Sequence, residues 1–449
     1  MIKKLLICGL HILLLSACTT VGQIENTPLS NAQTVKVTDE TLFSVTRNLD
    51  SEDVTLLLAF SGGGTRASAL SYGVMEELRD TQIMVNGRKK RLLDEVDFIS
   101  SVSGGSFTAA YYGLFRERLF KDYKDKILTK SLSDQIIQTV LNPFRWFSTL
   151  GRTDYATRLY ADSGFGDATF SDMLKNGAPV IAINATDLSQ GIRFTFLQDY
   201  FNLICSDLSQ FPVARAVAAS SAVPVLFDPV VVENFSSCDP VDLNNYIQSR
   251  TQAGSLSLQD TASAALSYTN KEDRQYVHLV DGGISDNLGL RMLLDTVEFA
   301  GGMKEYLDMA HQGENYLPSK QFVIIVVNAS VKADSDIDHY SSPPTITQTI
   351  NAVTDAQLHL YNNETLELAQ SLLDEWTVEM STDDRPVHAH LIVVELKSVK
   401  PDSLSSRLNL IPTTLGLPEE EVDLLIETGR RLLRQNEEYQ LLLKQLSGN

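Results

Sequence analysis

A run of three glycines is the first segment whose residues could do chemistry. It reads Ser-Gly-Gly-Gly-Thr-Arg at residues 61–66, directly after an apolar run and before a stretch with helical spacing. Consecutive glycines let the backbone turn sharply and direct several N–H groups at one point, and the N-terminus of a following helix adds positive potential there. The segment therefore predicts a nest of amides that could hold a phosphate or stabilise an oxyanion.

The same glycines also allow a dinucleotide-binding interpretation. Gly62, Gly64 and Ala67 satisfy a loose G-x-G-x-x-A fingerprint, which needs an acidic residue at the end of a second strand about 20 positions further on. Asp80 has roughly this spacing, but the residues before it have helical spacing and those after it are polar and basic. A P-loop is excluded because no Gly-Lys-Ser/Thr follows the glycines.

A serine-rich turn at residues 97–106 (DFISSVSGGS) has the order of a nucleophile elbow. An apolar strand, a tight turn of small residues and a helix follow one another, which would expose one serine hydroxyl at the end of the strand. The pattern is Ser101-x-Ser103-x-Gly105 in place of the full G-x-S-x-G, so Ser103 is the expected nucleophile. The three other serines between residues 100 and 106 remain alternatives for that role, and an ordinary Ser/Gly-rich turn is the alternative for the segment.

An aspartate follows a third apolar run, within the sequence Val-Asp-Gly-Gly at residues 280–283. Active sites of α/β sheets lie at the carboxyl ends of strands, where Asp281 is expected. A turn-forming Asp-Gly pair is the alternative. A serine nucleophile needs a base for its proton and N–H donors aimed at the developing oxyanion, each worth about 3–4 kcal/mol when removed. The three segments together would supply all of these parts.

A fourth block, Ala-Ser-Ser-Ala-Val-Pro-Val-Leu-Phe at residues 219–227, completes an ordered set of motifs. In this order the chain resembles the patatin-like phospholipases, whose motifs are GGGxR, G-x-S-x-G, A-S-x-A-x-P and Asp-Gly-Gly or Asp-Gly-Ala. The resemblance covers about residues 54–290. It implies a three-layer α/β/α fold and a catalytic Ser–Asp dyad without a histidine, with Ser103 as nucleophile and Asp281 as base.

The resemblance also implies roles for the glycine segment. The amides of Gly62, Gly63 and Gly64 would form the oxyanion hole, and Arg66 would position that loop or bind an anionic head group. No cofactor and no metal is expected. Ser101 departs from the family pattern, which has glycine there, and this difference puts the geometry of the elbow in question.

Histidine tests the dyad, because a Ser–His–Asp triad would need one in a recognisable motif, and none of the chain's histidines lies in one. His278 lies three residues before Asp281, so strand alternation would place the two side chains on opposite faces. We therefore expect a structural role for His278.

The elements that must position these residues are visible as apolar runs that do not alternate in polarity. They lie at residues 54–60, 96–101, 179–185, 193–197, 276–280, 322–328 and 390–396. Helical spacing is seen at residues 66–79 and 106–118, and a basic turn is expected at 88–91. Strands of this kind, alternating with helices, predict an α/β fold with a mostly parallel central sheet covered on both faces.

The domain organisation follows from shifts in composition. We expect a signal peptide at residues 1–17, a polar tether at 18–50, a hydrolase domain at 51–400 and a C-terminal helical extension at 401–449. Two insertions into the domain are predicted, a helical and aromatic one around Trp146 at 119–178 and a polar one, partly loop, at 234–275. Leucines at helical spacing in residues 419–446 predict a long amphipathic helix packed on the domain.

The N-terminus has the features of a secretion signal. Lys3 and Lys4 precede an apolar stretch that is too short to span a bilayer, and Leu-Ser-Ala-Cys ends at Cys18. This resembles a bacterial lipoprotein lipobox and implies cleavage before Cys18 and lipid attachment to it. Thr19, where an aspartate is absent, points to the outer membrane. An ordinary secretory signal with a chance cysteine is the alternative.

Composition excludes several classes of protein. The 449 residues are 43% apolar and 21% charged, and 37 basic against 57 acidic residues give a net charge of −20. Such an acidic chain is a poor nucleic-acid binder. Four cysteines without C-x-x-C spacing argue against structural zinc. An oxidising compartment would allow a disulfide between Cys205 and Cys238, with two buried thiols as the alternative.

The sequence therefore predicts a lipid acyl-ester hydrolase of the phospholipase A or lysophospholipase type, anchored to the bacterial envelope. Its partners would be membrane lipids, with no nucleic acid and no obligate protein partner. The alternatives are a non-catalytic envelope lipoprotein that keeps the fold for binding or scaffolding, and a dinucleotide-binding protein.

Overall fold

The fold is taken from a computed structural model, which describes residues 22–29, 53–85, 87–132, 151–175, 177, 179–238, 247, 254–311, 316–331, 337 and 341–447. The predicted signal peptide, Cys18, Trp146 and most of the predicted tether lie outside these residues.

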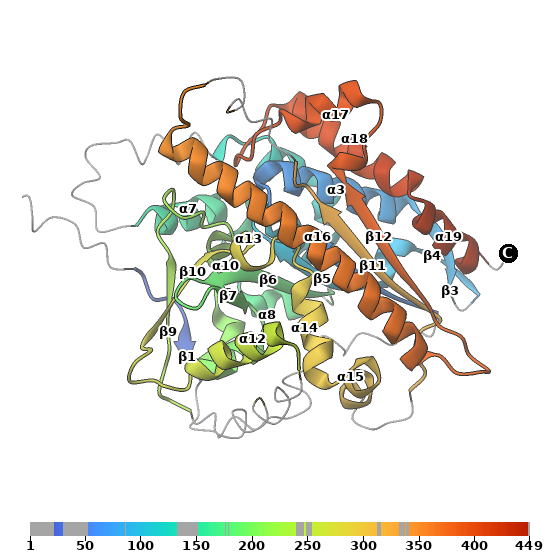
Figure 1. The fold of residues 1–449 in the computed structure, drawn as a ribbon, viewed down its shortest axis with the longest axis horizontal. Helices are drawn as coiled ribbons and strands as arrows, with labels where there is room; N and C mark the ends of the chain where they lie inside the picture. Colours follow the sequence, from blue (N-terminus) through green and yellow to red (C-terminus); the bar gives the residue numbers. More distant parts are fainter. Residues whose placement is uncertain are drawn as a thin grey trace, which may run out of the picture.

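A single eight-stranded sheet forms the centre of the described chain (Figure 1). Its strands are β2 (Val54–Phe60), β5 (Val96–Val102), β6 (Val180–Asp187), β7 (Ile192–Thr195), β9 (Val230–Glu233), β10 (Tyr276–Asp281), β11 (Gln321–Asn328) and β12 (His388–Glu395). The order is β12-β11-β2-β5-β6-β10-β9, and β7 pairs with β6. The five strands from β12 to β6 are parallel, whereas β10, β9 and β7 join antiparallel. The predicted α/β class with a mostly parallel sheet is therefore confirmed, with an antiparallel edge.

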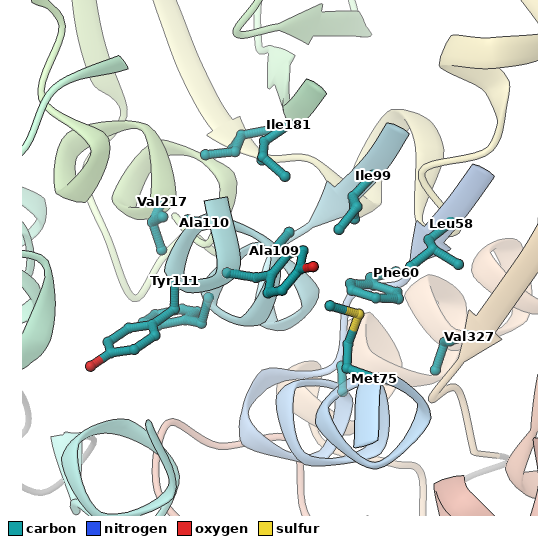
Figure 2. Packing of buried hydrophobic residues seen from close by; sticks show 14 of the residues in the cluster. Leu58, Phe60, Met75, Ile99, Ala109, Ala110, Tyr111, Ile181, Val217 and Val327 are labelled. Carbon is teal, nitrogen blue, oxygen red and sulfur yellow. The ribbon is translucent and has the colours of Figure 1, made fainter. Parts of the chain in front are cut away.

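Helices cover both faces of the sheet. Every residue of β2, β5 and β11 is buried, which explains why these strands have continuous apolar sequences. Alternate residues of β2 belong to two different cores: Leu58 and Phe60 to one, Leu57 and Ala59 to the other. Figure 2 shows the first core, where Leu58 and Phe60 lie near Met75.

Among the helices that contribute to the first core are α3 (Gly64–Asp80), α4 (Gly104–Phe115), α10 (Val213–Ser220), α18 (Glu419–Gln435) and α19 (Glu437–Leu446). The second core is covered by α14 (Arg291–Ala300), α15 (Met303–Ala310) and the 35-residue α16 (Ile346–Met380). Both predicted insertions contain helices: α5 (Leu119–Tyr123), α7 (Arg152–Tyr160) and α8 (Phe170–Lys175) in the first, and α12 (Leu256–Ser267) in the second. None of the described helices is long and apolar enough to cross a membrane.

Three local elements differ from the sequence-based expectation. The basic residues Arg88–Arg91 form strand β4 of a hairpin with β3 (Gln82–Val85), so they are not a turn. The single helix expected at 419–446 is two helices, because Asn436 ends α18 and its side chain caps α19 by accepting from the Tyr439 amide. Helix α16 was not foreseen; its start is fixed by a capping box between Thr345 and Gln348.

The C-terminal helices share the first core with the rest of the chain. Helix α18 packs directly along α3, so closely that a Cβ built on Gly73 would lie 2.1 Å from the carbonyl oxygen of Ile426. Arg430 and Arg434 of α18 pair with acidic residues near the end of α3, including Glu77.

Part of the predicted tether is bound to the body. Residues 27 and 28 form strand β1 (Thr27–Pro28), which pairs with β8 (Ser206–Asp207). The Asn26 side chain donates to the backbone oxygen of Glu233 and accepts from its amide. Residues 22–29 are therefore not a free linker, which corrects the tether prediction for this stretch.

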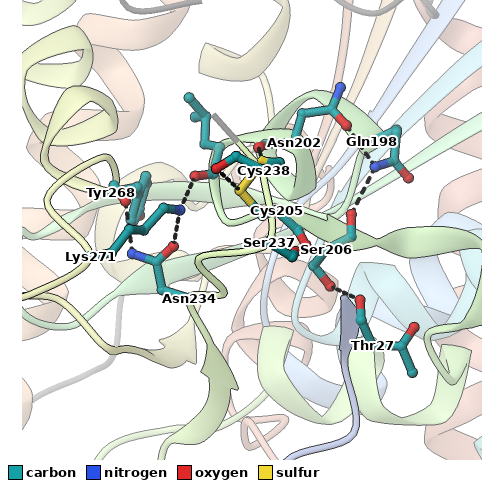
Figure 3. The surroundings of a disulfide bond; sticks show 11 residues. Thr27, Gln198, Asn202, Cys205, Ser206, Asn234, Ser237, Cys238, Tyr268 and Lys271 are labelled. Atoms are coloured by element: carbon teal, nitrogen blue, oxygen red, sulfur yellow. Dashed lines mark hydrogen bonds between the residues drawn. A yellow bond between two sulfur atoms is a disulfide. The ribbon is translucent and has the colours of Figure 1, made fainter. Parts of the chain in front are cut away.

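Cys205 and Cys238 form a disulfide next to this bound segment (Figure 3). The bond links the loop before β8 to the chain that follows β9, and Ser206 lies between the disulfide and Thr27. Of the two alternatives left open by the sequence, the structure has the disulfide.

Candidate active site

The turn between β5 and α4 has the backbone geometry of a nucleophile elbow. Ser103 has φ 49° and ψ −117°, a conformation that costs a non-glycine residue about 1–3 kcal/mol. Its amide donates to the hydroxyl of Ser220 at 2.8 Å. A Cβ on Gly104 would lie 2.0 Å from the carbonyl oxygen of Gly64, so only glycine fits where the elbow meets the glycine loop. The sequence thus brings two of its motifs into direct contact.

Strand register explains how Asp281 reaches this elbow. Strand β6 lies between β5 and β10; in parallel pairing Val102 faces Asn184, and in antiparallel pairing Asp281 faces Ala185. The carboxyl ends of β5 and β10 therefore lie at the same level of the sheet, on either side of β6. Ser103 follows Val102 directly, which places its side chain at the same edge of the sheet as Asp281.

The hydroxyl of Ser103 donates a hydrogen bond of 2.8 Å to Oδ2 of Asp281. The other carboxylate oxygen accepts from the amide of Gly283, also at 2.8 Å. Asp281 is only 8% exposed, and this burial raises its pKa to about 6, against the opposing effect of its two hydrogen bonds. The carboxylate is thus oriented by both oxygens and is more basic than an ordinary aspartate.

The other serines of the elbow have different partners. Ser100 accepts from Asn184, Ser101 donates to the backbone oxygen of Ala182, and Ser106 bonds to Ser220. Ser103 is therefore the elbow serine whose hydroxyl meets the aspartate. Ser101, which stands where the family pattern has glycine, is buried and hydrogen-bonded within the sheet, and the elbow conformation is present despite it.

The glycine loop corrects one part of the predicted oxyanion hole. The amide of Gly62 donates to the backbone oxygen of Asn287 at 3.0 Å, so it is not available to a substrate in this structure. The amides of Gly63 and Gly64 find no acceptor among the described residues. The amide of Gly104 also has no acceptor among the described residues. In nucleophile elbows the amide of the residue after the nucleophile commonly donates to the oxyanion. Sequence reasoning missed Gly104, although its position after the elbow serine was the signal.

The side chain of Arg66 points into the protein and is buried. Its Nε donates to the backbone oxygen of Ala329 at 2.9 Å, and its Nη1 donates to that of Ile411 at 2.6 Å. The side chain is 5% exposed, and burial lowers its pKa to about 10. Of the two predicted roles, this geometry fits positioning of the glycine loop and does not fit binding of a lipid head group.

The C-terminal segment supports the same loop. The amide of Thr65 donates to the backbone oxygen of Thr414 at 2.7 Å, and this carbonyl lies against Gly64. These contacts join residues far apart in the chain through backbone groups, so no sequence motif predicts them.

Ser220 and Ala222 of the fourth motif block hold the backbone of Ser103 and Asp281. Ser220 accepts from the amide of Ser103 and donates to the backbone oxygen of Asn184 at 2.6 Å. The amide of Asp281 donates to the backbone oxygen of Ala222 at 2.9 Å. The block therefore fixes the separation of the two reacting side chains, a role that the resemblance alone did not specify.

No described histidine belongs to the Ser103–Asp281 pair. His311 and His359 hydrogen-bond to backbone carbonyls, and His390 bonds to Glu438 and two glutamines. His278 is exposed on β10, where Asp281 is buried. None of the described histidines hydrogen-bonds to Ser103 or Asp281, and the described residues contain no cluster suited to holding a metal ion.

The structure does not place Asp80 where a dinucleotide-binding site would need its acidic residue. Asp80 is the last residue of helix α3 and pairs with Arg79 and Arg430, so it does not end a strand beside the glycine loop. The fingerprint match of Gly62, Gly64 and Ala67 therefore lacks the partner that ribose recognition requires.

A family model matches the part of the chain that carries the four motif blocks. Residues 58–294 match the family model of the patatin-like phospholipases. The match covers just over half of the chain and all four motif blocks, and the chain belongs to the patatin-like phospholipase family.

Two solved structures are similar in fold. Human GIVD cytosolic phospholipase A2 is 13% identical with a TM-score of 0.46, over 96% of this chain and 66% of that one. The same human enzyme in complex with methyl gamma-linolenyl fluorophosphonate is 11% identical with a TM-score of 0.43, over 95% and 70%. The chain thus spans slightly less than two thirds of the first structure. No curated protein matches the sequence.

Proposed function

We propose that this protein is a lipid acyl-ester hydrolase that uses Ser103 and Asp281 as a catalytic dyad and is held at the bacterial envelope by a lipid on Cys18. The observation that carries the proposal is the 2.8 Å hydrogen bond from the Ser103 hydroxyl to the buried Asp281 carboxylate. It joins an elbow serine to a base with a raised pKa, as acyl transfer requires.

In the first half-reaction, the oxygen of Ser103 attacks the carbonyl carbon of a lipid ester while Asp281 accepts its proton. A base with a pKa of about 6 is mostly ionised at pH 7 and still basic enough to assist the attack. The proton then passes to the departing alcohol, and the fatty acyl group remains as an ester on Ser103.

In the second half-reaction, Asp281 takes a proton from the water that attacks the acyl-enzyme, and it returns this proton to the Ser103 oxygen as the ester bond breaks and the fatty acid leaves. Both tetrahedral intermediates carry a negative oxygen. The amides of Gly63, Gly64 and Gly104, which have no acceptor in the part of the chain that the structure describes, lie around the elbow and would donate to this oxygen. Such donors are typically worth about 3–4 kcal/mol each.

The envelope location rests on the sequence before residue 22. The lipobox-like sequence ending at Cys18 supports lipidation, and the following threonine supports delivery to the outer membrane. Membrane phospholipids, lysophospholipids and glycerides would then be the available substrates. The bound segment from Gly22 onward would keep the catalytic body close to such an anchor.

A fluorophosphonate probe tests the dyad, because only an activated serine reacts with it. We expect labelling of the peptide that contains Ser103, and loss of labelling in Ser103→Ala and Asp281→Asn. Ser101→Gly, which restores the family pattern, is the matched control and should keep its labelling. Lipid mass spectrometry of membranes incubated with active and Ser103→Ala protein would then identify the substrate. A folded protein that resists the probe would favour the non-catalytic alternative.

A further inference from the structure

An exposed apolar loop follows helix α10 beside the candidate active site. Residues 223–226 (Val-Pro-Val-Leu) will be called the apolar loop. Val225 is 85% exposed and Leu226 is 62% exposed, and neither packs into a core. Loops that face water seldom place two large apolar side chains so near one another without a binding role.

The loop is held in this conformation by the protein. Val225 has φ +75°, which is unusual for a β-branched residue and costs backbone energy. Arg152 donates to the backbone oxygen of Val225 at 2.7 Å, and the same guanidinium pairs with Asp228. Because the side chain of Val225 gains nothing from folding, the strain is consistent with display of this side chain to a partner.

The apolar loop adjoins Asp281. Ala222, immediately before the loop, accepts the hydrogen bond from the Asp281 amide. On the other side, Gly283 donates to the Asp281 carboxylate, and the next residue, Ile284, is 50% exposed. Apolar side chains therefore flank the strand end that carries the base.

The bound N-terminal segment begins beside β9, the strand that follows the apolar loop. Gly22 lies against Val231, three residues after Asp228. The backbone oxygen of Gln23 accepts from Arg215, and the same guanidinium pairs with Asp154 of α7, the helix that also carries Arg152. The segment then runs to Thr27 beside the disulfide (Figure 3), so residues 22–27 are bound to the body.

The length of chain before Gly22 limits where an anchor can lie. Three residues lie between Cys18 and Gly22, so the two are four residue steps apart and at most about 14 Å from one another when the chain is fully extended. A lipid on Cys18 would therefore hold the edge of the molecule that carries β9 and the apolar loop against the bilayer. A long free linker would have allowed any orientation.

We propose that the apolar loop inserts into the surface of a lipid bilayer and turns the Ser103–Asp281 site toward it. The proposal rests on the lipid anchor and lipid substrate of the proposed function. Residues 223–227 carry no charge, whereas the chain has a net charge of −20. Insertion of apolar side chains, and not attraction to anionic lipids, would therefore supply the binding, and added salt should change it little.

The test places a polarity-sensitive fluorophore on the loop of the full-length, processed protein. Cys205 and Cys238 are joined, so Val225→Cys adds a free thiol that can be labelled. Val378→Cys is the matched control, because Val378 is 76% exposed on α16 and far along the chain from the loop. Labelling of the parent protein sets the background from any other thiol.

With vesicles of zwitterionic phosphatidylcholine, the label at residue 225 should shift to the blue and be quenched by lipids brominated on their acyl chains. The label at residue 378 should show neither change. Protein that floats with vesicles but is quenched equally at both positions would be held by its anchor alone, which would overturn the proposal. Failure to bind vesicles would overturn it as well, and a blue shift that rises with protein concentration before lipid is added would point to a second copy of the chain.

Kinetics give a second readout. Val225→Ser with Leu226→Ser should lower the ratio of vesicle-lipid turnover to short-chain ester turnover by about tenfold per residue, since about 1.4 kcal/mol corresponds to a factor of ten. Val378→Ser should leave the ratio unchanged. Fluorophosphonate labelling of Ser103 in the same variants separates the two proposals: a labelled serine with no change in the ratio rejects the docking loop, and an unlabelled serine in the parent protein rejects the hydrolase.

Discussion

The guanidinium of Arg66 donates to the backbone oxygen of Ile411, a contact between residues 345 positions apart. Arg66 lies in the first turn of α3, directly after the glycine loop, and its Nε holds Ala329 at the end of β11. Thr414 bonds to the neighbouring amide of Thr65. The C-terminal segment is thus part of the support of the candidate oxyanion hole.

Substitution of Arg66 tests this positioning role. Arg66→Gln would leave the carbonyls of Ala329 and Ile411 unpaired and let the glycine loop shift, so we expect kcat to fall about 100-fold with little change in KM. The measurement uses both a neutral short-chain ester and an anionic phospholipid. An increase in KM confined to the anionic lipid would show head-group binding instead.

The pKa of Asp281 predicts the pH dependence of activity. Because the carboxylate must be ionised to accept the serine proton, kcat/KM should rise with pH through about 6 and then reach a plateau. The measurement is the pH profile of short-chain ester hydrolysis. A profile that is flat between pH 5 and 7 would exclude Asp281 as the titrating base.

The raised pKa of Asp281 also predicts that removal of its ionisable carboxyl group stabilises the fold at neutral pH. Burial raises the pKa of Asp281 above its unfolded value of 3.8, so the folded state prefers the protonated form and stability falls as pH rises from about 4 through about 6. At pH 7 the free energy of unfolding of Asp281→Asn should therefore exceed that of the parent by about 2–3 kcal/mol, and its unfolding temperature should be higher. This difference should vanish near pH 4. Thermal unfolding at the two pH values provides the check.

The strained backbone of Ser103 predicts that glycine is more stable than alanine at this position, the reverse of the order inside a helix. At φ 49° glycine is preferred, so Ser103→Gly should be about 1 kcal/mol more stable than Ser103→Ala. Ser106 lies inside helix α4, where alanine is favoured over glycine by about 1 kcal/mol, so the order should reverse there. Chemical denaturation of the four variants measures both differences, and the same order at both positions would contradict a strained elbow.

Much of the scaffold could be predicted because buried parallel strands have continuous apolar sequences. The runs that became β2, β5 and β11 carry this signal. The glycine loop and the elbow directly follow a strand, and Asp281 is the last residue of one. The carboxyl ends of the parallel strands β2 and β5 meet at one edge of the sheet, so the glycine loop and the elbow could be placed together from the sequence. The approach of Asp281 depends on the antiparallel register of β10 against β6, which the apolar runs did not indicate.

What could not be predicted depends on partners without a sequence signature. The bond from the Gly62 amide to Asn287 and the supports from Ile411 and Thr414 are made by backbone carbonyls, which every residue has. Helix α16 was missed because its sequence is polar and rich in β-branched residues in its first half, so its helical pattern is weak. The binding of residues 22–29 likewise depends on tertiary contacts of a polar segment.

The close packing of α18 on α3 gives a final prediction. In most helices Gly→Ala stabilises by about 1 kcal/mol, but a Cβ on Gly73 would lie 2.1 Å from the Ile426 carbonyl oxygen, where neither backbone can yield without separating the helices. Gly73→Ala should therefore destabilise the protein by about 1–3 kcal/mol, as overpacked cores do.

Ser71→Ala, two residues earlier in α3, is the matched control for this prediction. The Ser71 hydroxyl is buried with no hydrogen-bond partner among the described residues, so its removal should be neutral or stabilising. Denaturant unfolding of the two variants would decide the point. Equal or greater stability of Gly73→Ala would mean that α18 does not lie against α3 as closely as the structure places it, and the support that the C-terminal segment gives to the glycine loop would then be in doubt.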